Sequence, residues 1–180
     1  MRSGRLSGNS SPESGGNMAY ILTVLLLAAG VLGCTEAQQA YSKLPDLYRN
    51  GVDLALQQLN SHSAIKNHFL FFKSLDKSDI DIRFGVRFFY HNFYLKVTSC
   101  AKGTANADPT KCPFRNNRPL IDCVACYNTY FGKIEPEPKP YIHCVHKPFF
   151  NQEVQTKRRI HCDGMNHMSG GGTLLAQKSP

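Results

Sequence analysis

The first periodic pattern in the chain is helical. Five apolar residues recur at helical spacing and share one face of a helix: Leu47, Val52, Ala55, Leu56 and Leu59. Pro45 and Asp46 predict the start of this helix, because proline is tolerated in a first helical turn. The polar run 60–63 predicts its end. Gly51 lies inside the helix, and its missing side chain predicts a close approach to a sheet.

Strand patterns follow the helix. An aromatic-rich run over residues 65–75 predicts a buried strand, and the polar residues 76–79 predict a turn. Residues 81–99 then alternate between apolar and polar side chains. This alternation predicts one long bent strand, or a pair of strands broken near His91 and Asn92.

The second half of the chain predicts two further strands. Apolar residues are concentrated in 120–131 and again in 141–146. Residues 148–160 show neither a helical nor a strand period, which predicts an irregular or edge-like segment. Residues 163–180 include a glycine-rich run and predict a flexible C-terminal tail.

The N-terminal part of the chain predicts export. The run from Tyr20 to Gly33 is apolar and uncharged, and it is shorter than the roughly 20 residues of a membrane-spanning helix. Small residues follow it, so we expect a signal peptide over 18–37 that is cleaved after Ala37, or near Gly33. Residues 1–17 then form a disordered, removable extension, or Met18 is the working start codon. A buried core helix and a bacterial lipoprotein cleavage box at the end of the run are the alternatives.

Composition limits the remaining chain to one modest, basic domain. The 180 residues carry a net charge of +8, and the part left after the leader predicts a single domain over 44–162. A basic secreted protein meets glycosaminoglycans, anionic membranes or acidic receptor surfaces, and we expect no nucleic-acid partner. The candidate basic surface consists of Arg115, Arg118, Lys157, Arg158 and Arg159. The alternative is that these charges serve solubility alone.

Six of the seven cysteines lie in one stretch: Cys100, Cys112, Cys123, Cys126, Cys144 and Cys162. An oxidising compartment favours a disulfide framework. The first two bracket a polar loop, and a bridge between them would contribute about 3 kcal/mol in the chain-entropy model. Cys123 and Cys126 lie three apart on a predicted strand and face opposite sides, so each needs another partner. We favour Cys100–Cys112, Cys123–Cys144 and Cys126–Cys162.

Zinc is the alternative use of this stretch. Seven residues resemble a zinc ligand set: Cys123, Cys126, His143, Cys144, His146, His161 and Cys162. Such sites belong to reducing compartments, whereas this chain is predicted to be secreted. No Gly-x-Ser-x-Gly elbow, paired carboxylate or phosphate loop accompanies the histidines, so we expect no enzymatic activity, no metal and no cofactor.

Several of these motifs, taken in order, resemble the chemerin family within the cystatin/cathelicidin superfamily. They are the helix 51–59, Val97-Thr-Ser-Cys100, Lys111-Cys112-Pro113, Cys123-Val-Ala-Cys126, His143-Cys144 and Cys162. The resemblance covers residues 44–162 and implies an α+β, cystatin-like fold. One α-helix would pack on a four- to five-stranded antiparallel sheet with three disulfides, and the family's cysteine pairing agrees with the order favoured above.

The resemblance also implies a function. Members of this family are secreted, monomeric, retinoic-acid-responsive chemoattractants and adipokines of the inflammatory response. They bind a G-protein-coupled chemerin-type receptor after extracellular proteases trim the C-terminal tail. In the family the receptor-binding segment is aromatic, but no residue after Cys162 is aromatic here. The corresponding residues would be Leu174 and Leu175, with Lys178 as a trimming site.

The superfamily implies a second function, host defence without receptor agonism. Cystatin-type inhibitors place a Gln-x-Val-x-Gly hairpin in a cysteine-protease cleft, and Gln152-Glu-Val-Gln-Thr156 matches that motif in part. Cationic members act on bacterial surfaces, and the basic segments 111–118 and 157–159 are candidates for such a role. Assays of protease inhibition, bacterial killing and receptor activation separate these functions.

Overall fold

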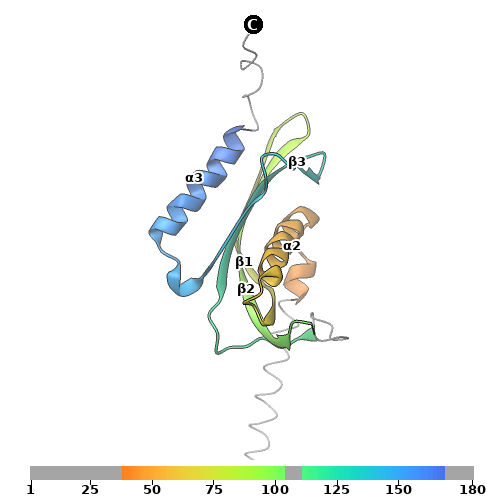
Figure 1. The fold of residues 1–180 in the computed structure, drawn as a ribbon. Helices are drawn as coiled ribbons and strands as arrows, with labels where there is room; N and C mark the ends of the chain where they lie inside the picture. Colours follow the sequence, from red (N-terminus) through yellow and green to blue (C-terminus); the bar gives the residue numbers. More distant parts are fainter. Residues whose placement is uncertain (1–37, 104–110, 169–180) are drawn as a thin grey trace, which may run out of the picture.

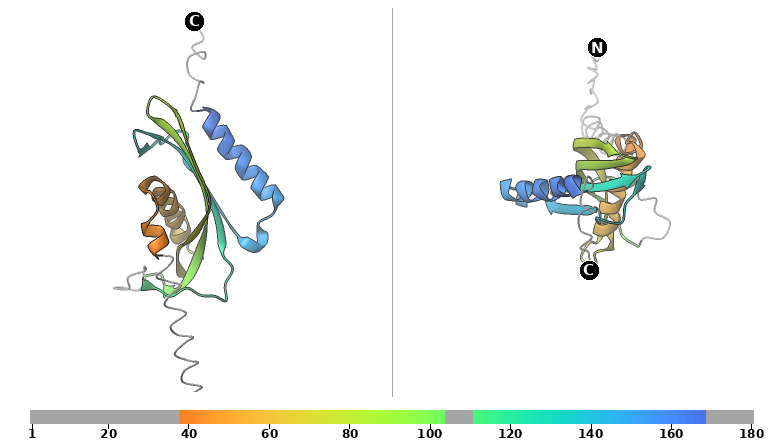
Figure 2. Two further views of the ribbon diagram at one scale, coloured as in Figure 1. Left: turned by 180° about the vertical axis from the view of Figure 1, so that it is seen from behind. Right: turned by 90° about the horizontal axis from the view of Figure 1, so that it is seen from above.

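A computed structural model describes residues 38–103 and 111–168, which form an α+β fold built on one antiparallel sheet. Within these residues the sheet has five strands: β1 (Asn67–Arg83), β2 (Val86–Ala101), β3 (Ile121–Tyr130), β4 (Lys133–Ile134) and β5 (Tyr141–His146). β2 lies between β1 and β3, and both β4 and β5 pair with β3. Helix α2 (Asp46–Ser61) covers one face of the sheet and helix α3 (Gln152–Met168) lies on the other (Figures 1 and 2).

Helix α2 has the predicted bounds and packs through the predicted stripe. Val52 is fully buried in a core that it shares with Phe93 of β2. Gly51 faces β3 so closely that an added Cβ would lie 3.1 Å from Cε1 of Tyr127 and 3.2 Å from Cβ of Ala125. The prediction that Gly51 allows a close approach to the sheet is therefore confirmed. Burial of such an apolar face stabilises a domain by about 25 cal/mol per Å² of surface removed from water.

The first hairpin reverses direction at a different place from the one predicted. β1 continues through residues 76–79, the predicted turn, and the chain turns at Phe84 and Gly85 instead. β2 also continues through His91 and Asn92, where a break was one of the two alternatives. β1 is an edge strand whose outer half faces solvent, so polar residues there do not end it. Charged side chains on an edge also discourage pairing with other molecules.

Helix α3 contradicts the prediction of an irregular segment over 148–160, and it extends to Met168, six residues into the predicted tail. The fold therefore has a second helix packed on the sheet, whereas only one was predicted. A half-buried residue and three buried ones form its inward stripe: Val154, Arg158, Cys162 and Met165. An arginine and a cysteine occupy two of these four positions, so the stripe is not apolar in the sequence. Asn151 caps the helix, since its Oδ1 accepts a hydrogen bond from the Val154 amide at 2.9 Å.

Candidate functional site

Three disulfides join the strands, the loop and α3 in the predicted order. Cys100–Cys112 closes the loop after β2, Cys123–Cys144 joins β3 to β5, and Cys126–Cys162 joins β3 to α3. Cys123 lies in the core beneath α2, whereas Cys126 lies in the cluster beneath α3. The inference that these two cysteines face opposite sides of one strand is confirmed. The disulfides use the sulfurs that the zinc alternative requires as thiolates.

Helix α3 is fixed to the sheet by a small apolar cluster around its disulfide. The buried members of this cluster are Phe88, Val124, Cys126, Cys162 and Met165. Most of the remaining surface of α3 is exposed, including Ile160, whose side chain is 67% exposed. The helix is thus held along a narrow line and leaves a broad face to solvent.

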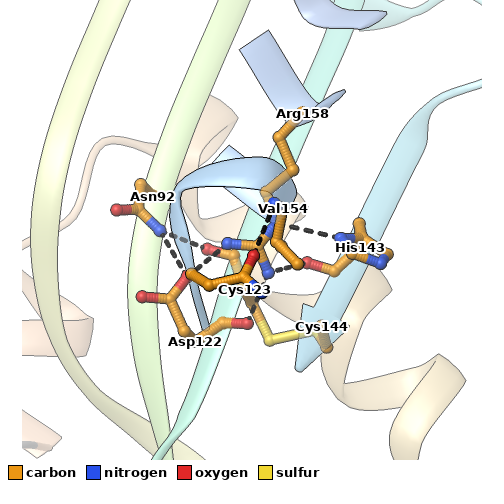
Figure 3. A network of polar contacts seen from close by, with 8 residues as sticks. Asn92, Asp122, Cys123, His143, Cys144, Val154 and Arg158 are labelled. Carbon is orange, nitrogen blue, oxygen red and sulfur yellow. Dashed lines mark hydrogen bonds and ion pairs between the residues drawn. A yellow bond between two sulfur atoms is a disulfide. The ribbon is translucent and has the colours of Figure 1, made fainter. Parts of the chain in front are cut away.

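A buried ion pair completes the attachment of α3 to β3 (Figure 3). The side chains of Arg158 and Asp122 are 3% and 2% exposed, and Nη1 of Arg158 lies 2.5 Å from Oδ1 of Asp122. Nη2 of Arg158 donates to the carbonyl oxygens of Asp122 and His143, at 2.8 and 3.0 Å. Asn92 donates to the same Asp122 oxygen at 3.0 Å. A buried pair with its hydrogen bonds satisfied in this way is costly to break.

His143 takes part in this network as a neutral imidazole. Its Nδ1 accepts a hydrogen bond from Nε of Arg158 at 2.9 Å, so that nitrogen carries no proton. Burial, and then the positive charge of Arg158, lower the pKa of His143 below its usual value. The prediction that Arg158 belongs to a basic surface is wrong, because its guanidinium lies in the interior. Its neighbours Lys157 and Arg159 are exposed, as predicted, and Lys157 pairs with Glu153 at 2.6 Å.

Arg115 and Arg118 lie on a groove of about 380 Å³ at the end of the sheet where β3 begins and β5 ends. Lys66 and His146 also line this groove, and none of its lining residues is acidic. Apolar side chains from three segments line it as well: Ile65, Phe69, Val97 and Pro119. The loop that carries Arg115 is fixed to β2, because the Arg115 amide donates to the Val97 carbonyl oxygen at 2.9 Å and the Cys100–Cys112 disulfide closes it.

The tips of the β1–β2 and β3–β4 hairpins lie together at one end of the sheet (Figure 1). This is the opposite end from the groove, and each tip carries a phenylalanine. Phe84 and Phe131 are 88% and 73% exposed, and each precedes a glycine with positive φ. Both phenylalanines themselves have positive φ, 53° and 46°. That conformation costs an L-residue about 1–2 kcal/mol, and for a bulky side chain it is a genuine outlier. The sequence signal was a Phe-Gly pair between two strands, which the alternating pattern around Phe84 concealed.

Several predicted residues lie outside the described part of the chain. They include the extension 1–17, the signal peptide 18–37 and the tail residues Leu174, Leu175 and Lys178. The partial Gln-x-Val-x-Gly match lies in the first turns of α3 and not in a hairpin. Within 38–103 and 111–168, no cluster of His, Cys, Asp or Glu side chains could hold a metal ion. No helix in those ranges combines the length and the apolar character that crossing a membrane requires.

Comparisons with known proteins add no family to this geometry. No protein-family model matches the chain, and no curated protein matches it.

Proposed function

We propose that this chain is a secreted, chemerin-like signalling ligand that activates a G-protein-coupled receptor through its C-terminal segment, after extracellular proteases have trimmed that segment. In this proposal the fold is cystatin-like, and the domain serves as a rigid carrier for the segment after α3. The helix on an antiparallel sheet and the pairing of the six cysteines support it. The protein acts as a chemoattractant or adipokine and is not an enzyme.

The attachment of α3 is the observation that carries the proposal. One disulfide, one buried ion pair and the contacts of Met165 hold this helix to the sheet, although most of its surface is exposed. A helix so attached fixes the point from which residues 169–180 leave the domain. A receptor ligand gains from such preorganisation, because less conformational entropy is lost when its effector segment binds.

Receptor activation by trimmed protein tests this function. Protein that ends at Lys178 should cause calcium release and migration in receptor-bearing cells, and the variant with Leu174→Ala and Leu175→Ala should have lost most of that response. Ile160→Ala serves as the matched control, because Ile160 is an exposed apolar residue on α3 itself. Silence of the trimmed protein at micromolar concentration, in cells that respond to a known agonist, would reject the proposal.

A second candidate function, binding of sulfated glycosaminoglycans or anionic bacterial surfaces, is favoured by the groove at Arg115 and Arg118. Two arginines, a lysine and a histidine line it without an acidic residue. Each ionic contact with a polyanion releases counterions, so binding should weaken steeply with salt. Arg115→Ala with Arg118→Ala should elute from heparin at lower salt than wild type, and Lys157→Ala with Arg159→Ala should not. Equal shifts for both pairs would indicate net charge alone and exclude a groove site.

A further inference from the structure

We infer that the two hairpin tips form a membrane-binding site: Phe84 and Phe131 insert into the interface of an anionic lipid bilayer, and Arg83 and Lys133 bind its headgroups. This inference is independent of the receptor activity proposed above. It uses surface features that the receptor proposal leaves without a role.

The two aromatic tips act as one surface because they adjoin. The amide of Phe131 donates to the carbonyl oxygen of Gly85 at 2.9 Å, which joins the second tip to the first. A Cβ added to Gly85 would lie 2.9 Å from the ring of Phe131, so this ring lies across the Gly85 backbone. Tyr130, 48% exposed, packs edge-on against Phe131 with 4.6 Å between ring centroids. Both hairpins lie at the same end of the molecule in Figure 1 and in the left view of Figure 2.

The turn geometry indicates that the exposure of the two phenylalanines has a function. A two-residue turn with positive φ at both positions favours Asn-Gly or Asp-Gly, because a short polar residue tolerates that backbone. Both tips have Phe-Gly instead, and both rings remain largely in solvent. The Phe131 ring packs on Gly85 and Tyr130 but is still 73% exposed, and the Phe84 ring is 88% exposed, so little apolar burial offsets the strained backbone. Strain of this kind, observed twice at one surface, points to a functional constraint.

The order of charges behind the tips fits an anionic bilayer. Arg83 and Lys133 flank the two turns, and both are exposed. The acidic residues nearest the tips, Asp81 and Glu135, stand two positions further from the tips than these cations. A surface approached tip-first therefore meets aromatic rings, then cations, then carboxylates. Aromatic side chains favour the headgroup region of a bilayer, and each nearby cation contributes attraction to anionic lipid.

Vesicle co-sedimentation tests the site. The protein purified from the medium of expressing cells, with its termini read by mass spectrometry, is mixed with vesicles of phosphatidylcholine alone or with a minority of phosphatidylserine. Wild type should sediment with the phosphatidylserine vesicles and weakly with the others. Phe84→Asn and Phe131→Asn should each weaken binding about tenfold, and Arg83→Gln or Lys133→Gln about fivefold at low salt.

The asparagine variants separate a binding defect from a folding defect. Because Asn is preferred at this turn position, Phe84→Asn should melt at or above the wild-type temperature. Phe149→Asn is the matched control: Phe149 is 74% exposed, lies between β5 and α3, and should leave vesicle binding unchanged.

Three outcomes would overturn the inference. The first is wild type that binds neither kind of vesicle. The second is a Phe84→Asn, Phe131→Asn double variant that binds as tightly as wild type. The third is loss of binding that Phe149→Asn reproduces. Papain inhibition that the tip variants abolish, without vesicle binding, would assign the tips to a protein cleft instead.

Discussion

Replacing Arg158 with methionine should strongly destabilise the attachment of α3 to the sheet. Methionine keeps much of the side-chain length but removes the charge and all four hydrogen bonds that Arg158 donates to Asp122 and His143. The carboxylate of Asp122, 2% exposed, then stays buried with Asn92 as its remaining side-chain partner. Breaking a buried ion pair in this way costs about 3–5 kcal/mol. That is a large part of the 5–15 kcal/mol that stabilises an ordinary domain.

The loss should be measured with the disulfides intact. Guanidinium unfolding followed by far-UV circular dichroism gives the free energy, and the melting temperature should fall by about 10–20 °C for a domain of this size. Hydrogen exchange should show the greatest loss of protection in α3 and β3. Arg159→Met is the matched control, since it makes the same change at the exposed neighbouring position and should cost less than about 0.5 kcal/mol.

A double variant tests whether the destabilisation comes from the Asp122 carboxylate that is left buried without its arginine. Asp122→Leu combined with Arg158→Met removes both charges, so its destabilisation should be smaller than the sum of the two single effects. Additive losses would show that the two side chains are not energetically coupled. A loss in Arg158→Met no larger than in Arg159→Met would refute the reasoning altogether.

Three further predictions concern the other face and the loop. His91 is 1% exposed, and burial lowers its pKa to about 4, so the folded protein holds it neutral. As the pH falls, the unfolded chain binds a proton on His91 before the folded protein does, so about 3 kcal/mol of the free energy of unfolding should be lost between pH 6.5 and pH 4. Denaturant titrations at each pH measure this loss, and His91→Leu should remove most of the pH dependence. Gly51→Leu should cost more than about 2 kcal/mol in the same titration, since its side chain would overlap β3, whereas Gly164→Leu, in helix α3 with open space around it, should cost less. Cys100→Ser with Cys112→Ser should cost about 3 kcal/mol, and an unchanged unfolding midpoint would contradict it.

The sequence predicts the face beneath α2 better than the face beneath α3, and the reason is the chemistry of the contacts. Residues such as Val52 and Leu59 report their helix because they are apolar at helical spacing. Arg158 and Cys162 occupy the corresponding positions of α3, and no hydrophobicity pattern includes an arginine whose partner is a buried aspartate 36 residues away. Only the cap at Asn151 and the i,i+4 pair of Glu153 and Lys157 could have indicated this helix.

The candidate sites also differ in how far the sequence predicts them. Strand geometry excludes a bond between Cys123 and Cys126, because the two side chains face opposite sides of β3. It does not decide which of them pairs with Cys144 and which with Cys162, and that choice agrees with the pairing that the family resemblance implies. The hairpin tips could not be predicted, because Phe84 continues the apolar alternation of its strand and becomes exposed only where the backbone reverses. The prediction of a turn at residues 76–79 is wrong for a related reason. On an edge strand, solvent satisfies side chains that would end a central strand.

Strand β3 has a cross-linked cysteine on each face, and both partners, Cys144 and Cys162, come later in the chain. During synthesis the thiols of Cys123 and Cys126 therefore lack their native partners until β5 and α3 have been translated. A swapped pairing would bring Cys162 to the α2 side of the sheet and carry the last helix over the wrong face. The order in which a thiol oxidase or isomerase meets these four residues should thus decide the yield of correctly assembled protein.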